Sequence, residues 1–362
     1  MSIQTQTVRD MEIVVVDDGS TDGTLAILED IARSEPRLLV VSKPNSGIVD
    51  SVQTGLRHCS ASVVARHDAD DLSAPDRFEA QLAYLDAHPD CVAVSGGAEY
   101  IDAKGALTGG SAPLLQMEAA DAEWAPAKEP YLKQPFLMVR RDSLLAVGGY
   151  RPLPVAEDSD LCWRLQEIGR LHNMPRSLGF YRVHDDSISS GSVRNGRVIS
   201  FWSQMVALSA RRRRAGRPDL RFTQADAARY KEAVTLADFH RIGCEQLEPE
   251  ERRRLRISIS AKLIEVCFYR NFEPDRSDSR FIQAAVREEA DLLSPANRDF
   301  LHGSIMHTAL RLAAKGRIVE AMLLLPVGRR PVLVARLVFR LGLPQPVRRL
   351  LKRFAAAPVP AV

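Results

Sequence analysis

The chain has 362 residues and a net charge of +3, and 45% of its residues are hydrophobic and 26% charged, a balance typical of a soluble globular protein and not of a disordered one. No run reaches the roughly 18 to 20 uninterrupted apolar residues that a membrane-spanning helix needs, and the first residues lack the pattern of a secretory signal, so we expect a cytoplasmic protein. The five cysteines are scattered without a CxxC pair, which favours reduced thiols over disulfides or a zinc site.

Short β-branched runs alternate with helical periods over residues 12–185, which is the pattern of an α/β sheet. The spacing of apolar residues predicts helices over 48–59 and 78–85. Each expected strand ends in an acidic or glycine-containing loop, where open α/β sheets usually bind ligands. The expected buried strands are 12–16, 38–41, 62–66 and 91–95.

The later part of the chain changes character twice. Residues 102–135 are weakly patterned and contain several glycines and prolines, so we expect a loop-rich insertion there. From about residue 190 onward the pattern becomes helical, with clear apolar periods over 305–312 and 318–325. Between these regions, ordered segments are expected at 136–150, 155–165 and 178–184.

Acidic residues gather at the ends of predicted strands. A carboxylate at the end of a buried strand repels its neighbours unless a cation or hydrogen-bond donors neutralise it. Hard oxygen ligands in such an arrangement favour Mg²⁺ or Mn²⁺, shared with substrate phosphates. Helix capping is the alternative, with Asp22 and Asp158 as candidate caps. The clusters are Asp17-Asp18, Asp68 to Asp71, and Glu157-Asp158 with Asp160.

The order and spacing of several motifs make residues 1–190 resemble glycosyltransferase family 2. The resemblance implies the GT-A fold, an α/β domain that binds a nucleotide sugar, over 1–190, followed by a helical region over 191–325 and a basic amphipathic tail over 326–362. A single such motif is weak evidence, whereas five in register are strong. The segments are EIVVVDDGSTDGT (12–24), PNSG (44–47), VVARHDADDLSAPDRFEAQLAYL (63–85), GGYRPLPVAEDSDLCWRL (148–165) and YRVHDDSIS (181–189).

The resemblance also implies an activity, namely metal-dependent, inverting transfer of a sugar from a nucleotide sugar, most commonly a UDP-sugar, to a glycan or lipid-linked acceptor. Asp70 and His184 would hold Mn²⁺ or Mg²⁺, and Asp158 would act as the general base with support from Glu157 or with exchanged roles. Lys43 could instead be an ordinary exposed lysine, and His184 a structural histidine. The nucleotide-binding residues implied are Asp17, Asp18, Ser20, Lys43, Asn45, Gly47 and Asp68.

Two features depart from the family pattern, and a third distinguishes the chain from the processive members of the family. Met1 falls inside an expected helix, so we expect a misassigned or truncated start that leaves out the first strand and the loop that contacts the nucleotide. Gln134 stands where related sequences often carry a histidine, which leaves the details of acceptor binding open. The chain lacks the QxxRW-type segment and the membrane helices of processive synthases, which favours a single-addition enzyme.

The basic residues are concentrated near the C-terminus, where eight of them and no acid follow Pro326. Arg336 and Arg340 are spaced four apart, as are Leu333, Leu337 and Leu341, which is typical of an amphipathic segment that contacts anionic lipid. A terminal helix that packs on the protein is the alternative. The run 211–214 (RRRR) has no aromatic platform beside it, so we expect no nucleic-acid site.

Rival functions remain open at the level of the sequence. A phosphoacceptor receiver domain also has an acidic pair and a later acceptor aspartate, which Asp17-Asp18 and Asp68 match loosely, but it leaves the segments after residue 148 unexplained. No GxGxxG motif follows a strand, which disfavours a nicotinamide dehydrogenase. An inactive, truncated relative that only binds its ligand is the main non-enzymatic alternative.

Overall fold

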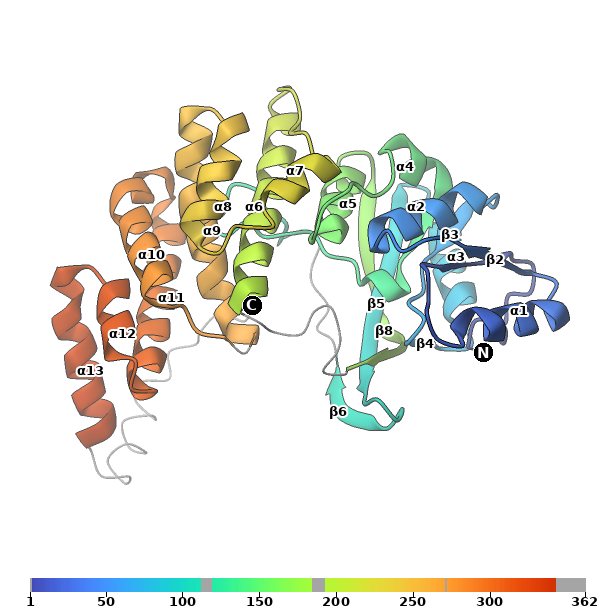
Figure 1. Ribbon diagram of the computed structural model, residues 1–362, viewed down its shortest axis with the longest axis horizontal. Coiled ribbons are helices and arrows are strands. Elements are labelled where there is room, and N and C mark those ends of the chain that lie inside the picture. The colour runs from blue at the N-terminus through green and yellow to red at the C-terminus, as the bar shows by residue number, and fades with distance from the viewer. Residues whose placement is uncertain (1, 112–118, 184–192, 271, 343–362) are drawn as a thin grey trace. The chain divides into compact units, whose positions relative to one another are not determined.

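The computed structural model describes residues 2–111, 119–183, 193–270 and 272–342 (Figure 1). The chain forms two compact units, each assembled from several segments. The first unit contains Met1–Glu123, Ala127–Ser190 and Trp202–Glu232, and the second contains Trp124–Pro126, Gly191–Phe201 and Ala233–Val362. Helix α6 (Val193–Arg214) has residues in both units.

The first unit is an α/β structure, as the sequence predicted. Its strands are β1 (Ile13–Asp17), β2 (Leu38–Ser42), β3 (Val63–Ala65), β4 (Leu72–Ser73), β5 (Cys91–Ile101), β6 (Leu107–Ser111), β7 (Met138–Arg140) and β8 (Arg170–Arg182). Its helices are α1 (Thr24–Ser34), α2 (Ile48–His58), α3 (Arg77–Ala87), α4 (Arg141–Ala146), α5 (Glu157–Gln166) and α7 (Gln224–Arg229). The four strands and the two helices expected before residue 96 are all confirmed.

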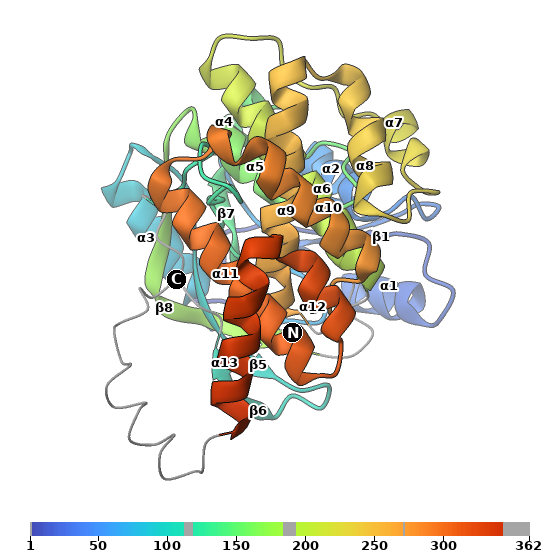
Figure 2. The ribbon, with the colours of Figure 1, turned by 90° about the vertical axis from the view of Figure 1, so that its left-hand side faces the viewer.

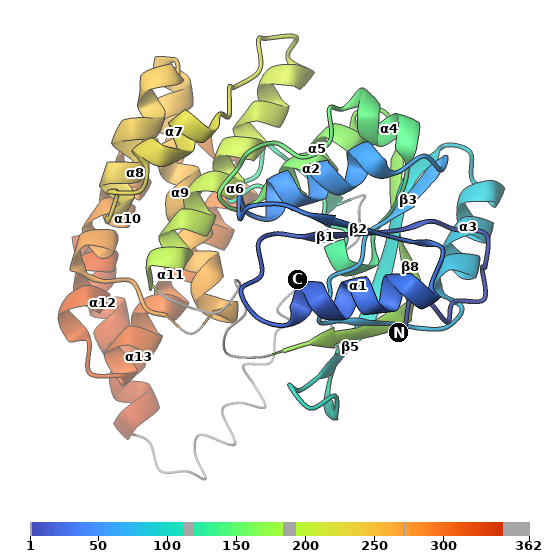
Figure 3. The same cartoon turned by 45° about the vertical axis from the view of Figure 1, so that its right-hand side comes forward.

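The described strands form two sheets. β1 and β2 pair in parallel as a two-stranded sheet, which Figure 3 shows beside α1. The larger sheet has the order β3-β7-β5-β8-β4, with β6 paired to β5. Its central pair, β5 and β8, is parallel and its other pairs are antiparallel, so the sheet is mixed.

Helices cover both faces of the larger sheet, and each strand buries one set of alternating side chains on each face. One core contains Leu56 of α2, Leu144 of α4 and Leu161 of α5 against β5 and β7. The other contains Phe78 and Leu85 of α3 against the opposite face. The unit is therefore layered as helix, sheet and helix, with β5 at the centre.

β5 extends to Ile101, whereas its apolar run predicted a strand over 91–95 only. β5 continues past residue 95 because Gly97 has no side chain; a Cβ there would lie 3.1 Å from the Arg176 carbonyl oxygen on β8. Similarly, a Cβ on Gly179 would lie 2.1 Å from the Leu72 carbonyl oxygen. β6 was not expected because all of its residues are exposed and it shows no apolar alternation.

The segment expected to be the end of a helix, residues 2–10, forms turns instead. Gln6 is fully buried and explains this conformation. Its amide donates to the carbonyl oxygens of Ser2 (3.0 Å) and Ala74 (2.7 Å) and accepts from the backbone N–H of Phe78 (3.1 Å). These bonds hold the segment on the beginning of α3.

The second unit is helical and has its own apolar core (Figures 1 and 2). The sequence predicted helices beyond residue 190, and of these α7 and part of α6 belong to the first unit. α9 packs against α10 and α11, and α12 packs against α10 and α11. Among the residues described, no helix has the length and apolarity to cross a bilayer. The helices are α8 (Leu236–Gly243), α9 (Pro249–Tyr269), α10 (Arg276–Glu289), α11 (Pro295–Ala314), α12 (Ile318–Leu324) and α13 (Arg330–Gly342).

Candidate functional site

The first acidic residue after β1, Asp17, is buried and holds the loop that follows it. Its carboxylate accepts from the backbone N–H of Ser20 (3.3 Å) and from the hydroxyl of Ser42 at the end of β2 (3.0 Å). The Ser20 side chain is the main cause that lowers the pKa of Asp17, and the Ser42 hydroxyl and the backbone N–H of Ser20 lower it further. The loop turns at Gly19, where φ is +76° and a Cβ would lie 2.8 Å from the backbone nitrogen of Asn45.

Asp18 joins this loop to the loop after β2. Its carboxylate accepts from the backbone N–H groups of Ser46 and Gly47, both at 2.9 Å, and from the Lys43 ammonium. Burial acts to raise the pKa of Asp18, but these donors outweigh it and lower the pKa to about 2. Lys43 also lies 3.1 Å from Asp50 and its side chain is only 14% exposed, so it is not the ordinary surface lysine that the sequence left open.

The loop after β3 carries the second acidic cluster, and β8 holds it in place. The backbone N–H of Arg182 donates to Asp71 Oδ1 (2.8 Å), and the Arg182 guanidinium donates to the Asp70 carbonyl oxygen (2.7 Å). Asp71 is buried and Asp70 is exposed. Burial, followed by the charges of Asp70 and Asp68, raises the pKa of Asp71 to about 6.

The cluster has the ligand chemistry for a hard divalent cation. Asp71 Oδ2 is buried and has no hydrogen-bond partner among the described residues, and it belongs to the same turn as the exposed Asp70. His184, the other predicted ligand, lies outside the described residues. In the described part of the chain, no three His, Cys, Asp or Glu side chains are placed to hold a metal together. The residues therefore fit an ion such as Mg²⁺ that takes one or two carboxylates and completes its shell with substrate phosphates and water.

The third acidic cluster lies at the beginning of α5. Ala156, which precedes the helix, has a φ of +63°, and the backbone N–H of Ser159 donates to Asp158 Oδ1 (2.7 Å). Burial, followed by the charge of Asp158, raises the pKa of Glu157 to about 7; burial also raises the pKa of Asp158. Because the two groups titrate together, the pair retains a proton near neutral pH that exposed carboxyls lose.

The guanidinium of Arg66 connects the second cluster to the third. Its Nε donates to Asp68 Oδ1 (3.2 Å), and its Nη1 donates to Gln134 Oε1 (3.2 Å) and to the Tyr150 hydroxyl oxygen (3.4 Å). The Arg66 charge lowers the pKa of Glu157, whereas the charge of Asp68 raises it, so the carboxylates of the two loops lie within electrostatic reach of each other.

The same contacts give Gln134 a structural role. Its Oε1 accepts from Arg66 and from the Tyr150 hydroxyl (2.5 Å), while its Nε2 donates to the Leu132 carbonyl oxygen (3.1 Å). A neutral amide can accept both bonds with one oxygen and donate the third with its nitrogen. This explains a glutamine at the position where a histidine was expected.

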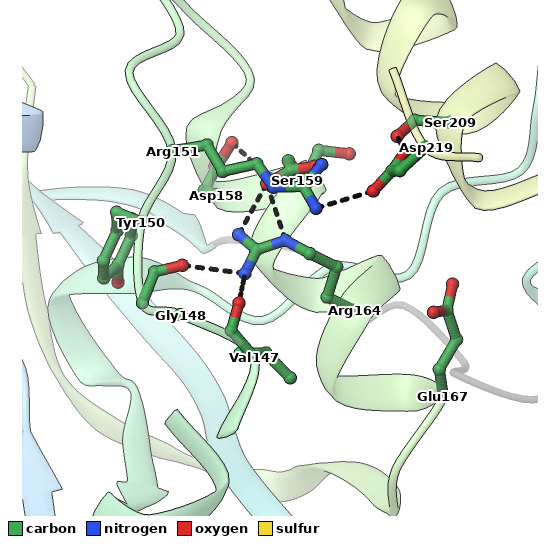
Figure 4. A network of polar contacts seen from close by, with 12 residues as sticks. Val147, Gly148, Tyr150, Arg151, Asp158, Ser159, Arg164, Glu167, Ser209 and Asp219 are labelled. Atoms are coloured by element: carbon green, nitrogen blue, oxygen red, sulfur yellow. Dashed lines mark hydrogen bonds and ion pairs between the residues drawn. The ribbon is translucent and has the colours of Figure 1, made fainter. Parts of the chain in front are cut away.

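A buried ion pair anchors α5 (Figure 4). Arg164 donates to Asp160 Oδ2 from two nitrogens, at 2.5 and 2.9 Å, and its Nη1 donates to the carbonyl oxygens of Val147 (2.6 Å) and Gly149 (2.8 Å). Arg151 lies 3.5 Å from the other Asp160 oxygen and also pairs with Asp219 at 2.7 Å. Asp160 therefore belongs to the support of the helix and not to the ligand site.

In the structure, most of the predicted site residues fall into two groups, and contacts connect the residues within each group. Six of them surround the ends of β1 and β2, and four lie on the loops that Arg66 connects. Arg66 and Tyr150 were given no role from the sequence, and Asp71 was named only as a member of the second acidic cluster. Arg66 stands two residues before Asp68 at the end of a strand, which is the only sequence signal for it. The first group is Asp17, Asp18, Ser20, Lys43, Asn45 and Gly47, and the second is Asp68, Asp70, Glu157 and Asp158.

Comparison with known proteins identifies relatives of the first unit. The family model described as Glycosyl transferase family 2 matches residues 2–147. The amylovoran biosynthesis glycosyltransferase AmsE of Erwinia amylovora is 30% identical over 190 residues, which cover 52% of this chain and 70% of AmsE. The putative glycosyltransferase EpsE of Bacillus subtilis is 32% identical over 192 residues, which cover 51% of this chain and 66% of EpsE.

Among solved structures, a mannosyltransferase of Pyrobaculum calidifontis, PcManGT, in complex with GDP-Man and Mn²⁺ aligns with 89% of this chain and 79% of its own, at 20% identity and a TM-score of 0.46.

The anchor of α5 can be tested by breaking the ion pair. Arg164→Met leaves Asp160 buried without its main partner, so the free energy of unfolding is expected to fall by about 3–5 kcal/mol. Urea unfolding monitored by circular dichroism measures the change. The control is the double variant Asp160→Leu/Arg164→Met, which leaves no buried charge and is expected to lose less stability than the single variant. Equal losses in both variants would contradict a role for the charge pair.

Proposed function

The chain belongs to glycosyltransferase family 2. From that premise we propose that it transfers a sugar from a nucleotide sugar, namely a UDP-sugar, to a hydroxyl group of a glycan or lipid-linked acceptor with inversion at the anomeric carbon. The curated relatives point to polysaccharide assembly as the setting, since AmsE is named for amylovoran biosynthesis. The family and the mixed sheet, with its antiparallel pairs, argue against the receiver-domain alternative.

The loops at the ends of β1 and β2 would bind the nucleoside. Asp17 and Asp18 stay ionised because donors within the loops lower their pKa values, and a carboxylate has lone pairs beyond those used here. Gly47, at the beginning of α2, has a φ of +90° and open space where a Cβ would be. Asp68 would contact the ribose.

Asp158 would be the general base that takes the proton of the acceptor hydroxyl, and Glu157 would support it. A base is most effective when its pKa is near the working pH, and burial of this pair moves it in that direction. Arg66 opposes this shift and so keeps part of the pair ionised. Inversion then needs one displacement and no covalent intermediate on the protein.

Asp70 and Asp71, with His184, are the residues that would hold the divalent cation. When bound, such an ion stabilises the charge that develops on the departing diphosphate, as a Lewis acid. The observation that supports the whole proposal is that Arg66 donates a hydrogen bond to Asp68 while its charge also acts on Glu157 and Asp158.

The donor can be identified by thermal stability. Wild-type protein is expected to melt at a higher temperature with UDP-sugars and Mn²⁺ than without them, because a ligand at 100 times its Kd stabilises by about 2.7 kcal/mol. Asp70→Asn should lose the part of this rise that depends on Mn²⁺, and Asp76→Asn, an exposed change outside the site, should keep it. If no nucleotide sugar stabilises the wild type, including GDP-sugars, the transferase proposal fails. Binding without release of UDP in the presence of acceptor glycans would instead support an inactive binding module.

The pH dependence of turnover tests the role of Arg66. The base must be deprotonated, so kcat falls as the pH drops through the pKa of the Glu157-Asp158 pair. Arg66→Gln removes a cation that lowers both pKa values and is expected to move this acidic limb to higher pH by about one unit, or about 1.4 kcal/mol. Arg176→Gln, which removes only an exposed pair with Asp76, is the control. A limb that stays in place or moves to lower pH would contradict the assignment.

We also propose that the C-terminal helix contacts an anionic membrane surface. Leu333 is buried and Leu337 packs on the core of the second unit. This face of α13 therefore packs on the protein, which was the alternative to a lipid-contacting segment. Val332 and Val334 flank Leu333 on α13 and are 45% and 49% accessible, and Val327, in the turn before the helix, is 69% accessible. Arginines lie among these valines, at positions 329, 330 and 336. A segment that exposes both apolar and basic side chains suits the interface of an anionic bilayer.

Binding to vesicles tests this contact. The protein is expected to sediment with vesicles that contain phosphatidylglycerol and not with neutral ones, and to be released by salt. Reversing the charge of Arg329, Arg330 and Arg336 to glutamate should weaken binding by at least about 100-fold, since each basic residue near the surface contributes about 1 kcal/mol. Arg276→Gln/Arg287→Gln changes exposed arginines elsewhere in the unit and serves as the control. Equal binding by both variants would rule out this surface.

A further inference from the structure

Most of the described cations around the acidic loops bind acceptor groups of the protein itself. Lys43 pairs with Asp18 and Asp50, and Arg66 bonds to Asp68 and Gln134. The Arg182 guanidinium donates to the carbonyl oxygens of residues 70, 102 and 103. Lys133 differs from these cations: its ammonium has no hydrogen-bond acceptor or carboxylate partner among the described residues. The ammonium lies over the ring of Tyr181, at 5.0 Å from the centroid.

The backbone around Lys133 is fixed, so the position of its side chain is set by the fold. The Lys133 carbonyl oxygen accepts from the hydroxyl of Ser95 on β5 (2.9 Å) and from the backbone N–H of Phe136 (3.1 Å). Two residues earlier, the Tyr131 carbonyl oxygen accepts from Asn173 on β8 (3.0 Å). Leu132 is fully buried in the core between α5 and the sheet. Lys133 is therefore held at the sheet by both of its central strands.

The surroundings of Lys133 lie between the acidic clusters. The ammonium is within electrostatic reach of Asp71, and Tyr131, two residues earlier, is within reach of Asp158. Tyr181, below the ammonium, makes an edge contact with Tyr100 at 6.0 Å between the ring centroids. The Lys133 ammonium therefore lies over an aromatic ring, and charged groups of the Asp71 turn and of the beginning of α5 are near this segment.

We propose that Lys133 binds an anionic group of the sugar donor, either the diphosphate or a carboxylate on the sugar itself. This inference rests on the proposed function. A partly buried ammonium without an acceptor is costly, since the water it gives up is not replaced. The ring of Tyr181 offsets part of that cost through its quadrupole but offers no acceptor for the N–H groups. An anion brought by the ligand would supply those acceptors.

The charge balance of the site favours the same conclusion. A nucleoside diphosphate is strongly anionic, and the carboxylates of Asp68, Asp70 and Asp71 repel it. A divalent cation on these residues would offset part of the repulsion, but the cations that the protein already pairs cannot turn to the ligand without leaving their partners. Lys133 can do so at no such cost.

Calorimetric titration of Lys133→Met tests the proposal. Methionine keeps the apolar stem over Tyr181 and removes the charge. With UDP, UDP-glucose and UDP-glucuronate as probes, and Mn²⁺ present, Kd is expected to rise about tenfold or more for the probes that carry the bound anion, because a charged hydrogen bond contributes about that much. An equal rise for all three probes places the anion in the diphosphate. A rise for UDP-glucuronate alone places it on the sugar.

Two further variants keep the test decisive. Lys104→Met removes an exposed lysine from the turn between β5 and β6 and should leave every Kd unchanged. Lys133→Arg should recover most of the affinity, which a loss of folding would not allow, and the Tm of each variant is measured beside its Kd. If folded Lys133→Met binds all three probes as tightly as the wild type, the proposal is wrong. If no probe binds the wild type, the proposed function itself fails and this inference fails with it.

Discussion

The arrangement of the first unit depends on how Arg66 offsets the repulsion between carboxylates from different loops. Without a cation between them, Asp68 and the Glu157-Asp158 pair would each favour the protonated state of the others. The guanidinium is the right group for this position because its planar fork reaches Asp68, Gln134 and Tyr150 in different directions at once and stays charged when partly buried. Tyr150 adds its ring, 5.6 Å from the guanidinium carbon. The loops therefore meet around one fixed positive charge.

The charge of Arg66 can set the pKa values of Glu157 and Asp158 only if these acids are held in place, and α5 holds them. Its first turn carries Glu157 and Asp158, while its next residues bury Asp160 against Arg164. The Arg164 guanidinium also donates to carbonyl oxygens of the loop that leads to Tyr150. Arg164 therefore positions both α5 and the tyrosine that contacts Arg66. Support and reactive groups thus share a short stretch of sequence, which explains why acids with different roles are adjacent in it.

Much of this could be predicted from the sequence, and the parts that could not share a physical cause. The strands before residue 96 follow from β-branched runs, and the acidic clusters follow from their places at strand ends. Asp158 and Asp160 are the same residue type, two positions apart. Only the fold shows that Asp160 forms an ion pair with Arg164, whereas burial raises the pKa of Asp158. Lys133 and Tyr181 are 48 positions apart, and no local pattern joins them. The length of β5 escaped prediction because it depends on glycines that let β8 approach.

The division of the first unit into two sheets bears on how a donor would be held. The residues assigned to the nucleoside lie on the β1-β2 pair, whereas Asp68 and the acid pair belong to the larger sheet. α1 has no fully buried residue, and only Asp17 of β1 is buried, so the smaller sheet has little core of its own. Between the beginnings of β1 and β3, Glu12 accepts from the backbone N–H groups of Ser60 (2.6 Å) and Ala61 (2.9 Å). Leu56 of α2 packs in the core of the larger sheet, and a ligand that contacts Asp18 and Asp68 together would add a further connection at the opposite ends of these strands. Part of its binding free energy would then go into ordering the smaller sheet, because regions with few buried apolar contacts open most readily.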